Sequence, residues 1–276
     1  MKLFRHSRAL VFSLLILFAG TALGANWEST LTSSSPRTFP PLRPLQAKYR
    51  FGWSGFTGGS GEVRVSKVSG GRLQVDAKLQ TVGLVRTLFK YDANQTATAD
   101  AGTLRPLEVR MIENDRSKKI VTICNYDSAG VTSKELETPG KNSAPTVRRF
   151  DAPNLFDMQT GLFYLRSQPL EERNVQRIVV YPGNQPYLAT ITVLGRERLT
   201  VPAGIYNAIK LDLQLSKIGK DRELKPYKKF RRATAWIADD ADRVLLRIEA
   251  QVFVGTVFGE LQSVEFDSAK PRLHPD

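Results

Sequence analysis

The stretch from Arg243 to Val254 is the most regular pattern in the sequence and restricts the folds that the chain can adopt. Every second position from Val244 to Val254 is apolar, whereas the positions between them are mostly charged or polar and include Arg247 and Glu249. Successive side chains of a strand point to opposite faces. The alternation therefore predicts one long strand, with its apolar side on the core or on a cavity wall and Arg243, Arg247 and Glu249 on the opposite face.

The segments on either side of this stretch are also extended in pattern. Residues 231–238 precede it and end in the acidic turn that holds Asp239, Asp240 and Asp242, while Gly255 permits a bend into residues 256–266. Aspartate is common in turns because its side chain bonds the nearby backbone. Residues 231–261 therefore predict a meander of three strands around an acidic turn.

Similar alternation recurs along most of the chain, separated by short turns that are rich in glycine. Two stretches change to helical spacing instead: residues 82–90, and residues 154–166, where Asn154 can cap a helix. The apolar stripe of the second helix is interpreted as core packing rather than as a ligand site. The predicted strands outside the meander are residues 45–53, 62–68, 73–79, 92–99, 104–113, 119–126, 131–136, 174–181, 187–199 and 205–217.

About twelve strands, two short helices and no alternation of strand and helix predict a single all-β or β-rich domain over residues 45–267. The expected architecture is a long, strongly bent antiparallel sheet. A sheet of this size should curl, and the sequence leaves open whether it forms a barrel, a half barrel that clasps a helix, or a two-layer sandwich.

The N-terminus has the features of a secretory leader. Basic residues in positions 2–8 precede an apolar run over residues 9–19, and small residues follow at positions 22 and 24. This order predicts a signal peptide over residues 1–24, cleaved between Gly24 and Ala25. An uncleaved anchor is the alternative, but the apolar run is short against the roughly 20 residues that span a bilayer. Residues 25–44 predict a disordered linker or draped arm, and residues 268–276 a polar tail.

The chain is strongly basic. Removal of the leader takes away three basic residues and no acidic one, so the formal net charge falls from +13 to +10. Such a balance favours anionic partners, which outside the cytoplasm include lipid head groups, lipopolysaccharide phosphates, cell-wall polymers and acidic proteins, whereas nucleic acid is not expected after export. No segment of the mature chain is apolar enough to cross a membrane, so an exported, soluble periplasmic or extracellular protein is predicted.

The residues needed for common catalytic chemistry are scarce. The mature chain has one histidine, His274, and one cysteine, Cys124, which lies within a predicted strand and is interpreted as a buried, inert thiol. A relay based on histidine and a histidine-rich metal site cannot be built from one histidine. We therefore expect no catalytic residue, metal or cofactor, although a carboxylate pair acting on a glycan stays open because such a pair needs only spatial proximity.

Positive charge is the remaining functional signal. Eight Lys and Arg residues fall within residues 217–232, with Tyr227 and Phe230 among them. A solvated loop is the simpler interpretation, and a lip that contacts anions beside the sheet is the functional one. The candidate binding residues of this region are Lys225, Lys228, Lys229, Arg231 and Arg232.

Several segments together resemble a bacterial exported family, the domain-of-unknown-function family 3108. They are the strand with Tyr49, Trp53 and Gly55, the helical segment 162–166, the turn 201–206, and the ending from 235 through 247–249 to 261. The resemblance covers about residues 45–266. It implies a β-rich periplasmic or cell-surface protein with no established activity, and it adds Arg166, Trp236 and Arg247 to the candidate binding residues.

The favoured hypothesis is a non-enzymatic binding or carrier protein for an amphiphilic or anionic component of the cell envelope, with the basic loop at the rim of the bent sheet. One alternative is an interaction module that contacts a cell-wall polymer or an envelope protein through its outer surface. The other is a carboxylate-dependent glycan hydrolase. A closed apolar cavity would favour the carrier, and a carboxyl pair in an open cleft would favour the hydrolase.

Overall fold

The computed structural model describes residues 27–32, 35–37, 40, 42–139, 144–227 and 232–267, without the side chain of Arg232. The predicted leader, its cleavage residues Gly24 and Ala25, and the tail 268–276 lie outside the described residues. The arm before the domain packs against it where it is described. Trp27, in the 3-10 helix η1 (Trp27–Thr30), is buried, and its indole donates a hydrogen bond to the Arg222 carbonyl at 2.7 Å.

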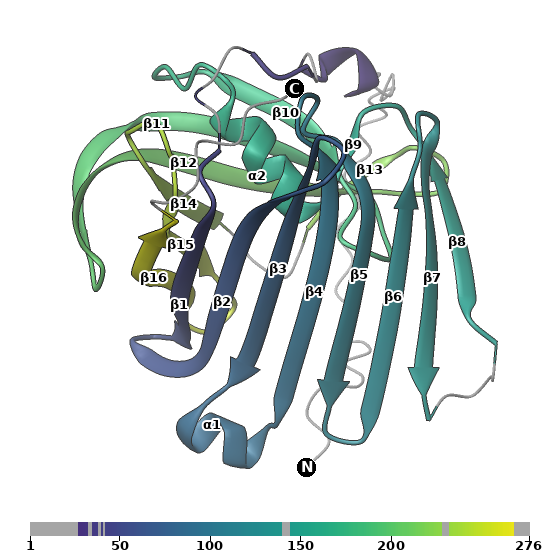
Figure 1. Ribbon diagram of the computed structural model, residues 1–276, viewed down its shortest axis with the longest axis horizontal. Helices are drawn as coiled ribbons and strands as arrows, with labels where there is room; N and C mark the ends of the chain where they lie inside the picture. Colours follow the sequence, from purple (N-terminus) through teal and green to yellow (C-terminus); the bar gives the residue numbers. More distant parts are fainter. Residues whose placement is uncertain are drawn as a thin grey trace, which may run out of the picture.

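Sixteen strands form one sheet, which follows the path β8-β7-β6-β5-β4-β3-β2-β1-β16-β15-β14-β12-β11-β10-β9, with β13 paired to β12 off this path (Figure 1). Adjacent strands are antiparallel except for the parallel pair of β9 and β10. The first half comprises β1 (Leu45–Trp53), β2 (Phe56–Val68), β3 (Arg72–Thr81), β4 (Tyr91–Asp100), β5 (Pro106–Asp115), β6 (Lys118–Tyr126), β7 (Gly130–Thr138) and β8 (Thr146–Asp151). The second comprises β9 (Leu155–Phe156), β10 (Val175–Val180), β11 (Tyr187–Val201), β12 (Gly204–Ile218), β13 (Leu224–Pro226), β14 (Arg232–Ala238), β15 (Leu245–Gln251) and β16 (Thr256–Phe266).

The predicted fold class is confirmed, and the sheet is open rather than closed into a barrel. The strands that the sequence pattern missed are β8, β9 and β13. Strands β8 and β9 form the two edges of the sheet, and β13 is a short addition to β12. A strand with one partner or few residues needs no sustained apolar face, so its alternation is weak.

Both predicted helices are present, as α1 (Gly83–Leu88) and α2 (Met158–Arg166). The cap of α2 differs from the prediction, because Asp157 rather than Asn154 begins it. The Asp157 carboxylate accepts hydrogen bonds from the backbone N–H groups of Gln159 and Thr160, and the Thr160 hydroxyl accepts one from the Asp157 N–H. The short strand β9 pairs with β10 between Asn154 and the helix, which moves the helix start beyond Asn154.

Helix α2 lies between the two halves of the bent sheet (Figure 1). Phe163 packs in a cluster formed mainly by the first half, whereas Tyr164 and Leu165 pack with β10, β11, β12 and β14. The half barrel that clasps a helix is therefore the architecture among the three expected ones. The predicted apolar stripe is core only in part, since Leu155 and Leu165 are buried, Leu162 is half-buried and Met158 is 54% exposed.

The predicted meander of β14, β15 and β16 is confirmed, but its central strand is shorter than residues 243–254. The register shifts so that Trp236 pairs with Arg247 and Ile237 with Leu245, which leaves Leu246 as an inserted residue. Such a bulge reverses the faces of the residues beyond it. Leu246 therefore packs in one cluster while Leu245 and Ile248 both pack against another, so the expected single apolar side is divided between two faces.

Candidate functional site

An apolar cavity of about 220 Å³ lies between α2 and the sheet. Helix α2 contributes Met158, Gln159, Leu162, Phe163 and Arg166, which lie on one face of the helix because their spacing follows its turn. Opposite them lie alternate residues of β1, namely Leu45, Ala47, Tyr49 and Phe51, with Val63 and Val65 of β2, Val75 of β3, Leu245 and Ile248 of β15 and Gly259 of β16.

Two glycines leave room for the aromatic wall of this cavity. The Phe51 ring lies over Gly61 of β2 and Gly259 of β16, where an added Cβ atom would come within 2.7 Å of a ring carbon in both cases. A larger residue at either position would have to displace the ring. The neighbouring Tyr49 is fixed differently, because its hydroxyl donates a hydrogen bond to the Leu245 carbonyl at 3.0 Å and so joins β1 to β15.

Charged side chains border the cavity at the C-terminal end of α2. Arg166 is buried and donates a hydrogen bond to the Ala241 carbonyl at 2.9 Å. Arg243 donates to the carbonyls of Arg166 at 2.7 Å and Gln168 at 2.6 Å, so it caps the end of the helix, where a cation is favourable. Burial lowers the pKa of Arg243. Asp242 is paired with Arg43, whose Nε donates to its carboxylate at 3.0 Å.

A second, larger hollow of about 990 Å³ is polar and lies between β8, the segment 181–186 and the β12–β13 hairpin. We call it the basic groove. Six basic and three acidic side chains line it: Arg148, Arg149, Lys217, Lys220, Arg222 and Lys225, with Asp151, Asp221 and Glu223.

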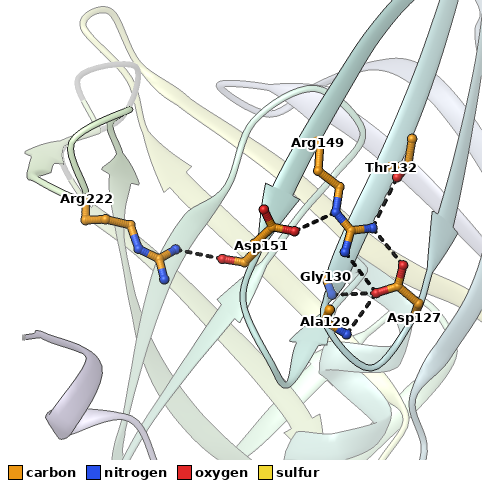
Figure 2. Close-up of polar contacts among 7 residues, drawn as sticks. All are labelled: Asp127, Ala129, Gly130, Thr132, Arg149, Asp151 and Arg222. Carbon is orange, nitrogen blue, oxygen red and sulfur yellow. Dashed lines mark hydrogen bonds and ion pairs between the residues drawn. The ribbon is translucent and has the colours of Figure 1, made fainter.

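Much of the charge in the basic groove is already paired (Figure 2). Arg149 binds Asp127 at 2.7 Å and Asp151 at 2.6 Å, and Arg222 donates to the Asp151 carbonyl at 3.0 Å. The Arg149 guanidinium, helped by backbone N–H groups, lowers the pKa of Asp127 to about 2. Further ion pairs join Arg148 to Glu135, Arg222 to Glu28 and Lys225 to Glu223. Lys217 and Lys220 make no ion pair with another described residue.

The structure distributes the predicted binding residues over three places. Lys225 lies in the basic groove, opposite Lys217 in the register of β13 and β12, and Arg166 lines the apolar cavity. Trp236 lies opposite Lys210 of β12. Lys217 is seven positions further along the same strand, which is about 23 Å at roughly 3.3 Å per residue, so Trp236 is far from the basic groove. Lys228, Lys229 and Arg231 lie outside the described residues, and of Arg232 only the backbone, at the start of β14, is described.

Trp236 and Arg247 are directly opposite each other on β14 and β15, inside a network of polar contacts. The Trp236 indole donates to Glu197 at 2.6 Å, and this hydrogen bond is the main reason that the pKa of Glu197 is lowered. Arg247 pairs with Glu249 at 3.1 Å and with the buried Glu260 at 3.3 Å, which Arg50 also binds at 2.6 Å. A buried carboxylate loses its hydration, and the two cations Arg50 and Arg247 offset this loss for Glu260.

The described residues of the basic loop line the basic groove and not the apolar cavity. Arg148 and Arg149 of the basic groove were not predicted from the sequence, and their signal is the adjacent pair of basic residues within edge strand β8. The role of Phe51 was not predicted either, although glycines on β2 and β16 are visible in the sequence.

The acidic and thiol groups are used structurally. Cys124 is buried as predicted, and burial raises the pKa of its thiol to about 12. Asp239 pairs with Arg196 at 2.8 Å, and Asp240 accepts from the backbone N–H groups of Asp242 and Arg243, which confirms a turn. Among the described residues, no group of three or more His, Cys, Asp and Glu side chains is arranged to hold a metal ion.

A family model described as a protein of unknown function, DUF3108, matches residues 48–262. The chain belongs to the DUF3108 family. Among curated proteins, no relative matches this DUF3108 chain. Its described residues contain no helix that is both long and apolar enough to span a bilayer.

Three solved structures are similar to the DUF3108 chain. A β-barrel-like protein with domain of unknown function DUF1849 from Brucella abortus is 10% identical, with a TM-score of 0.57, over 83% of this chain and 99% of that one. A protein with a YmcC-like fold from Bacteroides fragilis is 9% identical, with a TM-score of 0.36, over 83% and 99%. A proposed lipoprotein from Parabacteroides distasonis is 12% identical, with a TM-score of 0.36, over 84% and 100%. The first of these similarities concerns the fold alone.

Proposed function

We propose that this DUF3108 protein is an exported, non-enzymatic binding protein that holds a small amphiphile in the apolar cavity beneath α2. The observation that carries the proposal is a preformed apolar cavity with one buried cation, Arg166, in its wall. Ligand sites in proteins combine an apolar lining with a few polar groups that orient the ligand. The leader features of residues 1–24 support export, and the ligand is then a component of the cell envelope.

The cavity volume limits the size of the ligand. At roughly 30 Å³ for each water-sized group, 220 Å³ holds about seven such groups. This is below the roughly 300–1,000 Å³ of sites that enclose a drug-sized molecule. A single short alkyl chain fits, whereas a complete two-chain lipid could place only part of one chain inside.

Arg166 favours a ligand with an anionic end. Its buried guanidinium lies in the cavity wall, where it donates a hydrogen bond to the Ala241 carbonyl at 2.9 Å. A carboxylate or phosphate that receives a charge-assisted hydrogen bond from a buried guanidinium gains more than a neutral group does. We therefore propose a short-chain carboxylate or a similar anionic amphiphile as the preferred ligand class.

A chain-length series tests the proposal. The affinity of the purified protein for alkanoates from butanoate to dodecanoate is measured by isothermal titration calorimetry. Each buried methylene contributes about 0.8 kcal/mol, so two of them strengthen binding about tenfold. Affinity should rise to about eight carbons and then level off when the cavity is full. An affinity that ignores chain length, or no binding at all, contradicts the proposal.

Two variants locate the binding. Val63→Phe should fill the cavity and abolish octanoate binding, whereas Val147→Phe on the exposed face of edge strand β8 is the matched control. Arg166→Gln should weaken octanoate binding tenfold or more, since a hydrogen bond to a charged group contributes about 1.5–3 kcal/mol, and should leave octan-1-ol binding unchanged. Octanol binding thus shows that the variant is folded, and equal losses for both ligands would remove the role of Arg166.

The basic groove supports a second candidate function, contact with an anionic cell-wall polymer. The observation in its favour is that Lys217 and Lys220 face the groove without an ion-pair partner among the described residues. Co-sedimentation with an acidic polysaccharide, polygalacturonate, compares the unchanged protein with Lys217→Gln/Lys220→Gln and with the control Lys67→Gln/Lys134→Gln. Equal binding by both double variants would exclude the groove.

The glycan hydrolase stays the weaker alternative. The carboxylates of the groove include Asp151 and Glu223, which are each bound to a cation within 2.6 Å, Arg149 and Lys225 respectively. A hydrolase needs one carboxyl as a proton donor and a second as a base or nucleophile. Release of reducing sugar from peptidoglycan or polygalacturonate, lost in Asp151→Asn, is the result that would favour it over binding.

A further inference from the structure

Nine large apolar side chains are exposed at one end of the sheet, on three segments of the chain. We call them the apolar tip: Trp53, Phe56, Leu84, Val85, Leu88, Phe89, Phe253, Val254 and Val257. The exposed fractions reach 88% for Phe253, 85% for Leu84 and 76% for Phe56. Isolated exposed apolar residues are ordinary on protein surfaces, but a cluster of them marks a site of interaction.

The three segments are tied to one another by hydrogen bonds. The Trp53 indole donates to the Val254 carbonyl at 2.7 Å, and the Ser54 N–H donates to the Thr256 carbonyl at 2.7 Å, which joins the β1–β2 turn to the β15–β16 turn. Helix α1 is joined to β2 by the Val82 N–H, which donates to the Gly58 carbonyl at 2.9 Å. Figure 1 shows α1 and the β1–β2 turn side by side at the same end of the sheet. The three segments of the apolar tip therefore form a single surface, and these hydrogen bonds fix their relative positions.

The charges of the apolar tip have one sign. Residues 53–57, 82–90 and 252–257 contain no Asp or Glu, and their basic residues are Arg86 and Lys90. Arg116, in the next turn, places its guanidinium 5.7 Å from the centre of the Phe89 ring. The acidic residues next to these segments are Asp92, which is paired with Arg86 at 2.8 Å, and Asp115, which directly precedes Arg116 at the end of β5.

We propose that the apolar tip docks the protein onto an anionic lipid bilayer. Aromatic and aliphatic side chains on projecting turns can enter the boundary between head groups and acyl chains, where Trp and other amphipathic residues are enriched. Lys90 and Arg116 then lie at the level of the lipid phosphates, and attraction to anionic lipid adds to the burial of apolar area. The absence of acidic residues from the three segments favours this occupant over a basic protein surface.

Vesicle flotation tests this docking. The chain is purified as the cell produces it, with its mass measured so that all variants share one N-terminus. Vesicles contain phosphatidylethanolamine and phosphatidylglycerol at 7:3, or phosphatidylcholine alone. We expect binding to the anionic vesicles that weakens at high salt. Phe56→Ser/Phe253→Ser should reduce it at least tenfold, because burial of each aromatic side chain is lost.

The matched control is Ile205→Ser/Val147→Ser, which removes two exposed apolar side chains of the β11–β12 turn and of β8. It should float like the unchanged protein, and Lys90→Gln/Arg116→Gln should remove the dependence on anionic lipid. Equal flotation of the two serine variants overturns the proposal. So does a self-associating protein that becomes monomeric in Phe56→Ser/Phe253→Ser and never floats, because the tip is then a contact between copies.

This docking is independent of the ligand in the cavity beneath α2. None of the residues changed in the flotation test lines that cavity. Octanoate binding by calorimetry should therefore be the same in Phe56→Ser/Phe253→Ser as in the unchanged protein, so failure of one proposal can be distinguished from failure of the other.

Discussion

The apolar cavity and the basic groove are built in opposite ways. The cavity is small and apolar, and residues from Leu42 to Gly259 line it beneath one helix. The groove is more than four times larger by volume and strongly charged, but most of its cations are bound to carboxylates of the same chain. A run of basic residues in a sequence is therefore not a measure of the positive charge available to a ligand.

The two regions should also differ in what their side chains contribute to stability. A large buried side chain stabilises the fold by removing its whole apolar surface from water. An exposed ion pair only replaces the interactions that each charge would otherwise make with water, so its net contribution to stability is small. Loss of packing at the cavity should therefore destabilise the protein more than loss of an ion pair at the groove.

Phe156→Ala should cause the largest loss of stability. Phe156 is fully buried beside Tyr164 of α2, with ring centres 4.9 Å apart. Truncation should lower the free energy of unfolding by about 4 kcal/mol and loosen the helix that roofs the cavity. Urea denaturation measures the loss. Phe150→Ala at the groove is the comparison, and a loss as large there would show that the groove is as tightly packed as the cavity.

Gly259→Val should cost about 2 kcal/mol through overpacking, because its side chain meets the Phe51 ring. Octanoate binding should fall as the ring is pushed toward the cavity. Gly219→Val is the matched change at the groove, where the nearest atom is Cγ of the flexible Glu223 side chain at 2.9 Å, and it should be better tolerated. Thermal unfolding and calorimetry measure both, and equal costs would contradict the contrast.

Two carboxylates should respond to pH in opposite directions. Burial raises the pKa of Asp157, so its folded form holds the proton better than the unfolded chain does, and its contribution to stability is lost as pH rises above about 4. The Arg149 guanidinium lowers the pKa of Asp127 to about 2, so its contribution is present above about 4 and is lost as pH falls toward 2.

Melting temperatures of the unchanged protein, Asp157→Asn and Asp127→Asn between pH 2 and 8 check these signs. Relative to Asp157→Asn, which keeps a capping side chain, the unchanged protein should gain stability on acidification from pH 7 to 4. Relative to Asp127→Asn it should lose stability from pH 5 to 2. Differences that move in the same direction would contradict the assignment of burial to one site and ion pairing to the other.

Arg149→Gln should have the smallest effect on stability. The bonds of Arg149 to Asp127 and Asp151 are solvent-exposed, and backbone N–H groups of Ala129 and Gly130 still hold Asp127 after the change. Its melting temperature should be close to that of Arg198→Gln, a change at an exposed residue of β11, and the remaining difference should vanish in 1 M salt. A loss comparable to that of Phe156→Ala would make the ion pairs, rather than the packing, the main support of this region.

Sequence patterns predicted all strands except β8, β9 and β13, both helices, and the half barrel as one of three architectures, because long segments with one buried face impose a clear period. The bulge at Leu246 could not be predicted, because an inserted residue leaves the local alternation of the sequence intact. The position of the bulge is set by the pairing with the partner strand. The helix cap at Asp157 was displaced by a short parallel strand whose pairing is long-range. The cavity depends on glycines of two other strands beneath Phe51, which no local window of sequence brings together.

The pairing of β1 with β16 also determines how early, during synthesis of the chain, folding can be completed. Arg50 and Glu260, which are bonded across these strands, are 210 residues apart in the chain. Strands that pair over such a separation form slowly, because the entropy cost of closing a long loop comes before the contacts that offset it. The cavity wall therefore cannot form until β16 has left the ribosome. Until then the chain is not completely folded, and this is the stage at which an exported protein would have to cross the membrane.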